Sequence, residues 1–265
     1  MVRANKQGIK GIAKKGMNQM EDKVKHLVDW LQAKVAEAKV DGLLVGISGG
    51  IDSAVVAHLI KKAMPDHSLG VMMPCKSEGD DLVHAQAVAA SCDIDSLTID
   101  LSETHDVLFG TINETLEKAD LVNVEQTRLA DANLRARLRM STLYTVATNH
   151  RYLVVGTDNL AEWHTGYFTK YGDGGVDIAP LVHLTKGEVR EMARYLGVPD
   201  TVIDKKPSAG LWEGQTDENE MGTTYDMIDR YLKGESIPEK DRKIIDAMHQ
   251  RSQHKRDGIG FPPAF

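Results

Sequence analysis

Apolar residues follow two alternating patterns along this chain. Short, nearly continuous apolar runs predict strands at residues 43–47, 69–73, 152–156 and 178–184, and alternating apolar residues predict a strand at 95–99. Apolar residues at helical spacing predict helices, which lie at 20–39, 53–63, 80–91, 103–118, 123–149, 185–196, 223–233 and 238–250. Apolar strands that alternate with helices are typical of a parallel sheet covered on both faces. We therefore predict an α/β fold, with a doubly wound, mostly parallel five-stranded sheet and additional C-terminal helices.

The predicted order of elements brings two polar loops together. Right-handed crossovers place the loops after the first and fourth strands at the same edge of the sheet. Ligands of such sheets bind beyond the carboxyl ends of the strands, where the strand order reverses. We therefore expect residues 48–53 to meet residues 157–162, with a ligand close to both.

The first of these loops has the composition of an anion site. It reads Ser-Gly-Gly-Ile-Asp-Ser over 48–53 and leads from a strand directly into a helix. The first N–H groups of a helix have no partner inside it and attract phosphate, and glycine lets the backbone approach closely. Asp52 would repel a phosphate unless a cation lay between them, which suggests Mg²⁺. The run is not a Walker A loop, and the alternative is a tight turn whose serine and aspartate only cap the helix.

The second loop carries a matching carboxylate. It reads Thr-Asp-Asn-Leu-Ala-Glu over 157–162, and Glu162 would be the second ligand of the same metal. In the alternative, Asp158 or Asn159 caps a helix and Glu162 is exposed. Lys186 lies in the first turn of the predicted helix 185–196, which opens with a capping box. A cation is unfavourable there, so Lys186 is either a solvated surface lysine or the partner of an anion.

Three further segments have compositions that suggest function. Residues 163–177 combine aromatic, basic and glycine residues, and this segment could stack a flat heterocycle or form a structural loop. Residues 204–222 have no periodicity, and a loop of this length inside a compact domain is usually a lid or a binding loop. The basic cluster His254–Lys255–Arg256 near the end of the chain is either solvated or able to reach a phosphate.

Composition narrows the class of protein. The 265 residues carry a net charge of -7, which argues against nucleic acid as the main partner. The two cysteines, Cys75 and Cys92, have no metal-site spacing and make no disulfide framework, so a reduced, cytoplasmic setting is expected. No apolar run is long enough to span a membrane. Residues 1–19 are interpreted as a basic N-terminal arm, mobile or ordered against a partner subunit, before a single domain at 20–265.

The run at 48–53 resembles the pyrophosphate-binding loop of the N-type ATP pyrophosphatases, and this implies an adenine nucleotide alpha hydrolase-like fold. The chain from about residue 20 to its end resembles NAD+ synthetase. The motifs that carry this resemblance are Gly156-Thr157-Asp158-Asn159, Glu162, residues 165–175, Leu184-Thr185-Lys186, Lys206-Pro207-Ser208-Ala209 and His254-Lys255-Arg256. The run at 165–175 is the specific part, and Tyr167 departs there from a phenylalanine that is common in the family.

The resemblance implies an ATP-dependent carbon–nitrogen ligase. ATP adenylylates the nicotinate carboxylate of deamido-NAD+ with release of pyrophosphate, and ammonia then displaces AMP to give NAD+. The carboxylate needs this activation because oxide is a poor leaving group, whereas AMP is a good one. Cys75 and Cys92 lie inside the synthetase part and no glutaminase domain is recognised. We therefore expect free ammonia as the nitrogen source, unless a separate glutaminase subunit delivers it.

The resemblance also implies roles for individual residues. The residues that would bind ATP are Gly46, Ile47, Ser48, Gly49, Gly50, Ile51, Asp52, Ser53, Thr157, Lys186 and Ser208. The ligands of Mg²⁺ would be Asp52 and Glu162. The residues that would contact deamido-NAD+ are Arg137, Lys170, Asp177, His254 and Lys255.

Two residues would take part in catalysis. Lys186 would stabilise the charge that grows on the leaving pyrophosphate. Asp173 lies where the family places a residue near the incoming ammonia, and it could bind ammonium and act as a general base. The family is a homodimer with the dinucleotide across the interface, and helix 123–149 would fit there.

Two other functions share parts of these patterns. Another N-type ATP pyrophosphatase, such as a GMP or argininosuccinate synthetase, or a tRNA-thiolating enzyme, would share the loop at 48–53. A GMP synthetase would usually bring further domains, and a thiolating enzyme would need a catalytic cysteine pair and a basic RNA surface. A non-enzymatic adenine-nucleotide sensor would share the sheet but has little need for Asp52, Glu162 and Lys186 together.

Overall fold

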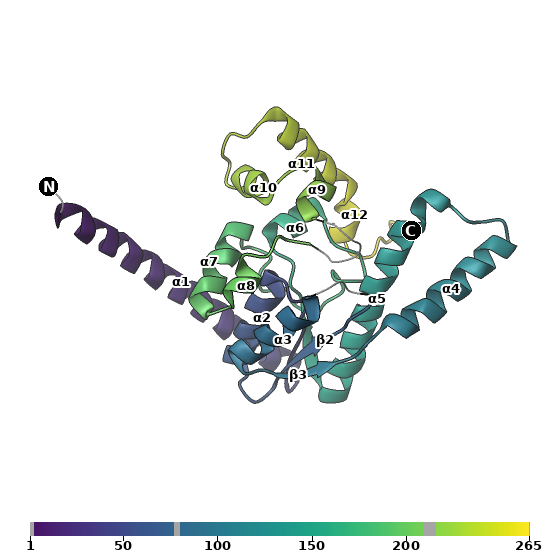
Figure 1. The fold of residues 1–265 in the computed structure, drawn as a ribbon, viewed down its shortest axis with the longest axis horizontal. Coiled ribbons are helices and arrows are strands. Elements are labelled where there is room, and N and C mark those ends of the chain that lie inside the picture. Colours follow the sequence, from purple (N-terminus) through teal and green to yellow (C-terminus); the bar gives the residue numbers. More distant parts are fainter. Residues whose placement is uncertain (1–2, 77–79, 209–215, 265) are drawn as a thin grey trace.

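A four-stranded parallel sheet forms the centre of the computed structural model, which describes residues 3–76, 80–208 and 216–264 (Figure 1). Its strands are β1 (Gly42–Gly46), β2 (Ser68–Met72), β3 (Asp95–Thr98) and β4 (Tyr152–Val155). The strand order is β3-β2-β1-β4, and each pairing is parallel. The predicted parallel α/β fold is therefore confirmed.

Helices connect these strands and continue beyond the last one. They are α1 (Arg3–Ala38), α2 (Ile51–Ala63), α3 (Asp81–Cys92), α4 (Ser102–Lys118), α5 (Val124–His150), α6 (Leu160–Thr165), α7 (Lys186–Leu196), α8 (Asp200–Ile203), α9 (Asp217–Met221), α10 (Tyr225–Leu232), α11 (Glu239–Arg251) and α12 (Gln253–Arg256). Helices α2 to α5, α7, α10 and α11 match the predicted ranges to within a few residues, whereas α1 begins well before its predicted start at residue 20. The short helices α6, α8, α9 and α12 were not predicted.

The sheet lies between two layers of helices. On one side, Leu43 and Val45 of β1 belong to an apolar core that includes residues of α1, α2 and α7. On the other side, Leu44 of the same strand packs with Ala147 of α5. Successive side chains of a strand point to opposite faces. A strand buried on both faces is therefore apolar at each position, which explains the continuous apolar run of β1.

The order of the strands reverses between β1 and β4. The chain moves outward from β1 through β2 to β3, and it returns to β4 on the other side of β1. The loops after β1 and β4 therefore leave the same edge at the point where such folds open a binding crevice. Asn159 Nδ2 donates a hydrogen bond to Asp52 Oδ1 at 2.9 Å. The predicted meeting of the two polar loops is confirmed.

The predicted fifth strand at 178–184 is wrong. Ile178 makes an isolated bridge to Val155, and turns follow it. Pro180 has no N–H group to give to a strand ladder. The carboxylate of Asp177 accepts the N–H of Val154 at 2.8 Å, where a strand would offer a carbonyl. The segment is still buried, because its apolar residues Leu181 and Leu184 belong to the core, and this burial explains the apolar pattern.

The C-terminal helices form an apolar cluster of their own. Ala161 of α6, Tyr225 and Ile228 of α10, and Ile245 of α11 are its buried members, together with Met221 at the end of α9. Figure 1 shows these helices gathered around α6 at one end of the molecule. Helix α9 falls within the segment 204–222 that was predicted as a lid or binding loop, and residues 209–215 of that segment lie outside the described residues.

Helix α1 begins at Arg3 and continues without a break to Ala38. Its C-terminal half packs on the core through Val24, Leu31 and Val35, whereas its N-terminal half runs away from the sheet (Figure 1). Most of the predicted basic arm is thus part of this helix, while residues 1–2 lie outside the described residues. Contact of the arm with a partner subunit stays a prediction, as does the domain boundary at residue 20. In the part of the chain that the structure describes, no helix is long and apolar enough to cross a membrane.

Gly49 provides a test of the turn that follows β1. Its φ is +79°, and a Cβ atom there would lie 2.6 Å from the backbone oxygen of Asp81 in α3. We expect Gly49→Ala to lower the free energy of unfolding by about 2 kcal/mol or more, because left-handed backbone alone costs an L-residue roughly 1–2 kcal/mol. Gly50→Ala is the control, since φ is -91° there and the added Cβ would meet the end of the Ser48 side chain at 3.3 Å. Urea denaturation measures both variants, and equal stabilities would contradict this description of the turn.

Candidate active site

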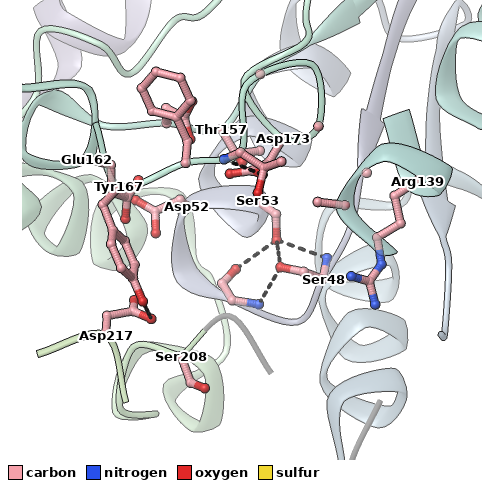
Figure 2. A pocket seen from close by; sticks show the side chains of 18 of the residues that line it. Ser48, Asp52, Ser53, Arg139, Thr157, Glu162, Tyr167, Asp173, Ser208 and Asp217 are labelled. Atoms are coloured by element: carbon pink, nitrogen blue, oxygen red, sulfur yellow. Dashed lines mark hydrogen bonds between the residues drawn. The ribbon is translucent and has the colours of Figure 1, made fainter. Parts of the chain in front are cut away.

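The turn between β1 and α2 is folded by its own serines (Figure 2). Ser53 Oγ accepts a hydrogen bond from Ser48 N at 3.2 Å, donates to Gly50 O at 3.0 Å and lies 3.1 Å from Ser48 Oγ. The N-cap of α2 is Gly50, and no side chain caps this helix. Gly50, Ile51 and Asp52 line a cavity. The start of α2 is therefore open to an anion, and the alternative in which the serine and aspartate only cap the helix is wrong.

A buried lysine joins the two predicted carboxylates. Lys186 Nζ lies 2.6 Å from Asp52 Oδ2 and 3.1 Å from Glu162 Oε1, and the lysine side chain is only 2% exposed. Thr185 caps α7 and makes a capping box with Glu188, which fixes Lys186 at the first position of that helix. Burial lowers the pKa of Lys186, but the two carboxylates raise it more, so that it lies above its ordinary value. Lys186 is thus the partner of anions and not a solvated surface lysine.

Glu162 caps a helix and faces the site at the same time. Its Oε2 accepts from Asn159 N at 3.1 Å, and Asn159 Oδ1 accepts from Glu162 N, which makes a capping box at the start of α6. Its Oε1 contacts Lys186 and also accepts from Tyr225 OH at 2.9 Å. The side chain is 13% exposed, so the alternative with an exposed Glu162 is wrong. Burial raises the pKa of this carboxyl, and Lys186 acts in the opposite direction.

The donor atoms of this site fit Mg²⁺ chemically. Mg²⁺ prefers one or two carboxylates together with phosphate oxygens, and Asp52 and Glu162 reach a common point at Lys186 Nζ. Among the described residues, no group of three or more His, Cys, Asp and Glu side chains could hold a metal ion. A cation would compete with Lys186 for the same oxygens. The pair therefore suits a metal that arrives with a phosphate ligand, provided that Lys186 moves.

A cavity of about 440 Å³ lies at the carboxyl edge of the sheet. The predicted site residues that line it are Gly46, Ile47, Ser48, Gly50, Ile51, Asp52, Ser53, Thr157, Glu162, Asp173, Lys186, Ser208 and Lys255. Figure 2 shows several of these side chains gathered around one space, with Arg139 of α5 on its far wall. Gly49 instead faces α3. The structure thus brings together most of the predicted ATP-binding residues, both predicted metal ligands and Asp173.

The other residues predicted to bind the dinucleotide make contacts outside the cavity lining. Arg137 Nη2 donates to Lys170 O at 3.3 Å, and Lys170 Nζ donates to His254 O at 2.5 Å. Asp177 accepts a backbone N–H of β4. Their roles in dinucleotide binding stay a prediction.

The aromatic and glycine-rich segment forms part of the cavity wall. The rings of Phe168 and Trp163 stack with centroids 5.4 Å apart and an interplanar angle of 11°. Lys255 Nζ lies 5.2 Å from the Phe168 ring and donates to Gly166 O at 2.7 Å. Phe168 therefore already has a ring partner within the protein, while Tyr171 is exposed. Stacking of a heterocycle on this segment stays a prediction.

Asp173 is a carboxyl group in the cavity wall. Thr169 N donates to its Oδ1 at 3.0 Å. The side chain faces the cavity. Partial removal from water by the surrounding protein raises the pKa of the carboxyl, whereas the hydrogen bonds from Thr169 and the charge of Lys255 lower it by a smaller amount. Asp158 lines the same cavity and is buried, and burial with the nearby Asp173 charge raises its pKa as well. Raised pKa values bring both carboxyls closer to neutral pH, where a carboxylate is a more effective base.

Several residues of the site were missed or underestimated from the sequence. Asn159 was considered only as a cap, yet it also binds Asp52. Tyr225 bonds Glu162, but it lies among apolar residues at helical spacing and is indistinguishable from a core residue in the sequence. Arg139 lines the cavity, and its Nε donates a hydrogen bond to Met73 O at 3.1 Å. In the sequence, the high arginine content of α5 is the feature that could have indicated this residue.

Fold and site together define a class of protein. An open helix start beside an acidic pair, at the point where a parallel sheet reverses its order, is how nucleotide-binding α/β proteins hold phosphate. The Ser-Gly-Gly turn without a Walker A lysine resembles the pyrophosphate-binding loop of the ATP pyrophosphatases among them. Comparison with known families narrows the class. The profile described as NAD synthase matches residues 23–258, and the chain belongs to the NAD synthase family.

Relatives support this placement over nearly the whole chain. An NH(3)-dependent NAD(+) synthetase of Alkaliphilus metalliredigens is 56% identical over 234 residues, which cover 88% of this chain and 95% of that protein. The structure of NMN synthetase from Francisella tularensis is similar with a TM-score of 0.85 and 37% identity, over 93% of this chain and 99% of that one. NAD+ synthetase from Burkholderia pseudomallei is similar with a TM-score of 0.73 and 28% identity, over 91% of each chain. The family resemblance seen in the motifs is confirmed.

Lys186→Met tests whether one ammonium group balances the two carboxylates. Methionine keeps a long side chain but leaves Asp52 and Glu162 facing each other without a cation. We expect the free energy of unfolding to fall by about 3–5 kcal/mol, the usual cost of an uncompensated buried charge. Mg²⁺ should restore part of this loss, because the freed carboxylates can bind it in the folded state. The melting temperature with and without Mg²⁺ measures both effects.

Lys23→Met is the matched control for that variant. Lys23 Nζ pairs with Glu188 Oε1 at 2.6 Å, but both side chains are about one-third exposed. An exposed ion pair contributes roughly 0–1 kcal/mol, so this variant should lose little stability and respond to Mg²⁺ like the unaltered protein. If Mg²⁺ does not change the melting temperature of Lys186→Met, the proposed competition between Lys186 and the metal for the carboxylates is wrong.

Proposed function

We propose that this protein makes NAD+ from deamido-NAD+, ATP and ammonia through an adenylylated intermediate. The observation that carries the proposal is the contact of Lys186 with both Asp52 and Glu162 beside the open start of α2, in a chain of the NAD synthase family. This arrangement offers positive charge to a phosphate and negative charge to a cation. A protein that only sensed a nucleotide would have little need for both.

The first step activates the nicotinate carboxylate. One carboxylate oxygen attacks the α-phosphorus of ATP, the bond to the bridging oxygen of the β-phosphate breaks, and pyrophosphate leaves with the electron pair. The N–H groups at the start of α2 and the ammonium of Lys186 stabilise the charge that grows on the pyrophosphate. Asp52 and Glu162 would hold Mg²⁺, which supplies further neutralisation of the phosphate oxygens. Thr157 and Ser208, which also line the cavity, would orient ATP.

Lys186 changes partners in this proposal. A lysine ammonium is a compact charge on a flexible stem, so it can move from a carboxylate to a nearby phosphate. The phosphate then replaces the carboxylates as its anionic partner, and Asp52 and Glu162 would be left to hold the metal ion. Each buried charge keeps a partner in both states, which avoids the cost of an unpaired ion.

The second step forms the carbon–nitrogen bond. Ammonia attacks the carbonyl carbon of the acyl adenylate, AMP leaves with the former carboxylate oxygen, and the nitrogen loses a proton. Most ammonia is ammonium at neutral pH, so a base has to take a proton before the attack. Asp173 is our candidate for this base because it lies in the cavity wall with a raised pKa.

We also infer a homodimer with the dinucleotide near its interface. Large apolar side chains are exposed along α4, the connection that follows it and the first half of α5, and they are Val107, Leu108, Ile112, Leu121, Val122, Val124 and Leu129. A concentration of large exposed apolar side chains along one part of the chain often marks a protein–protein interface. Arg137 follows on the same helix, exposed and close to Lys170, which suits an anionic ligand bound beside such an interface.

A second acceptor is supported by one observation. The similar structure with a TM-score of 0.85 is that of an NMN synthetase, whereas the NAD+ synthetase structure described above has a TM-score of 0.73. Nicotinate mononucleotide carries the same ring carboxylate as deamido-NAD+ and would undergo the same two steps. It lacks the adenylate half, so it would make fewer contacts with residues such as Arg137.

The test of function is incubation with ATP, Mg²⁺, ammonium and one acceptor at a time, followed by mass analysis of the products. With deamido-NAD+ we expect NAD+, AMP and pyrophosphate in equal amounts, because each turnover releases one of each. Conversion of nicotinate mononucleotide at a similar kcat/KM would establish the second acceptor. Glutamine in place of ammonium should give no comparable rate. Binding of ATP without pyrophosphate release in the presence of deamido-NAD+ would point to a sensor and would overturn the proposal.

Asp173→Asn tests the proposed base, because an amide has nearly the same shape but cannot take the proton. We expect ammonia-dependent turnover to fall by roughly 100-fold or more, the usual contribution of a general base. Exchange of labelled pyrophosphate into ATP with deamido-NAD+ present reports the first step alone, and it should be nearly unchanged. Full turnover of the variant with ammonia would exclude the role proposed for Asp173.

A further inference from the structure

Tyr225 is a buried tyrosine that the mechanism above does not use. It is the first residue of α10 and is 1% exposed. Its ring belongs to the apolar cluster with Ala161, Ile228 and Ile245. Its hydroxyl group leaves this cluster and reaches the acidic site. A buried tyrosine normally finds a hydrogen-bond partner for its O–H group, so the identity of that partner indicates what the residue does.

The hydroxyl of Tyr225 bonds the carboxylate of Glu162. The distance from Tyr225 OH to Glu162 Oε1 is 2.9 Å, and the distance to Asp217 Oδ2 is 3.0 Å. The ammonium of Lys186 lies 4.5 Å from the centre of the Tyr225 ring. One side chain therefore contacts Glu162 with its hydroxyl group and Lys186 with its ring face, where a cation is favourable.

Burial and the two carboxylates keep this hydroxyl protonated. Burial raises the pKa of Tyr225, and the charges of Glu162 and Asp217 raise it further. A neutral phenol has one proton to donate and can also accept a hydrogen bond. The hydroxyl group lies within donor distance of both carboxylates, so Tyr225 is a donor that Glu162 and Asp217 share.

We propose that Tyr225 is a positioning residue that fixes the Glu162 carboxylate for Mg²⁺. This inference rests on the proposed function, in which Lys186 leaves Glu162 when ATP binds. The Oε2 atom of Glu162 then keeps its bond from Asn159 N, and the Oε1 atom keeps its bond from Tyr225 OH. Two donors, one at each oxygen, would thus keep the carboxylate in a fixed orientation in which it can bind the metal. Partners that orient a metal-binding carboxylate in this way typically contribute about 10–100-fold to metal affinity.

The test compares Tyr225→Phe with Tyr231→Phe. Both residues lie on α10, and both variants lose one hydroxyl group bonded to a carboxylate, because Tyr231 OH donates to Asp246 Oδ1 at 2.7 Å. Neither tyrosine lines the cavity, but Glu162, which bonds Tyr225, does line it, whereas Asp246, which bonds Tyr231, does not. Binding of ATP is titrated by calorimetry at a series of Mg²⁺ concentrations. We expect Tyr225→Phe to need about 10–100-fold more Mg²⁺ for half-maximal binding, and Tyr231→Phe to match the unaltered protein.

Turnover provides a second readout that a merely structural role would not give. At saturating Mg²⁺ the kcat of Tyr225→Phe should return to within about twofold of the unaltered protein, with unchanged KM for ammonia, because the chemistry of the second step does not involve this residue. A Mg²⁺ requirement equal to that of Tyr231→Phe would overturn the inference. If the unaltered protein itself releases no pyrophosphate with deamido-NAD+, the proposed function fails, and the two failures are thereby distinguished.

A second pair of variants keeps the comparison possible if Tyr225→Phe does not fold. Loss of the hydroxyl leaves Asp217 without this donor, and Asp217→Asn removes that unpaired charge. Tyr225→Phe is therefore also made in the Asp217→Asn background, with Asp217→Asn alone as its reference. The same rise in Mg²⁺ requirement is expected between these two proteins, and the absence of a rise would overturn the inference in the same way.

Discussion

One buried ammonium group holds the site together. Lys186 of α7 pairs with Asp52 of α2 and with Glu162 of α6, so a single charge connects segments that lie far apart in the sequence. A charge removed from water is costly unless it is paired. The surrounding polar contacts follow from this constraint, because Asn159 satisfies the second oxygen of Asp52 and Tyr225 adds a donor to Glu162.

The same constraint links the stability of the site to its chemistry. A nucleotide phosphate and a divalent cation bring opposite charges, and Lys186 can accept the phosphate while the carboxylates accept the cation. Neutrality is then preserved during binding, and the positive charges lie where negative charge grows on the leaving pyrophosphate. A ligand that brought one sign of charge alone would leave a buried ion without a partner. Charge balance thus accounts for a site that can be stable when free and reactive when loaded.

Local features of this protein could be predicted from the sequence, and features that depend on packing could not. The strands β1, β2 and β4 and the turn at 48–53 are local patterns, because a central strand covered on both faces requires an apolar run and the Ser-Gly-Gly turn requires a particular backbone. The fifth strand failed because Pro180 and the side chain of Asp177 replace ladder bonds, although the segment is buried. The sequence left Lys186 either solvated or paired, and only the packing of α7 against α2 decides between them. The role of Tyr225 depends on where its hydroxyl group points. The periodicity of apolar residues in the sequence does not reveal this direction.

The central claim is that Lys186 exchanges its carboxylate partners for a phosphate when the metal and nucleotide bind. A crystal structure with Mg²⁺ and a non-hydrolysable ATP analogue tests it directly. We expect Lys186 Nζ to lie within hydrogen-bond distance of a phosphate oxygen, and the metal to be coordinated by both Asp52 and Glu162. A bound nucleotide with Lys186 still seated between those two carboxylates, and the metal held elsewhere, would contradict it.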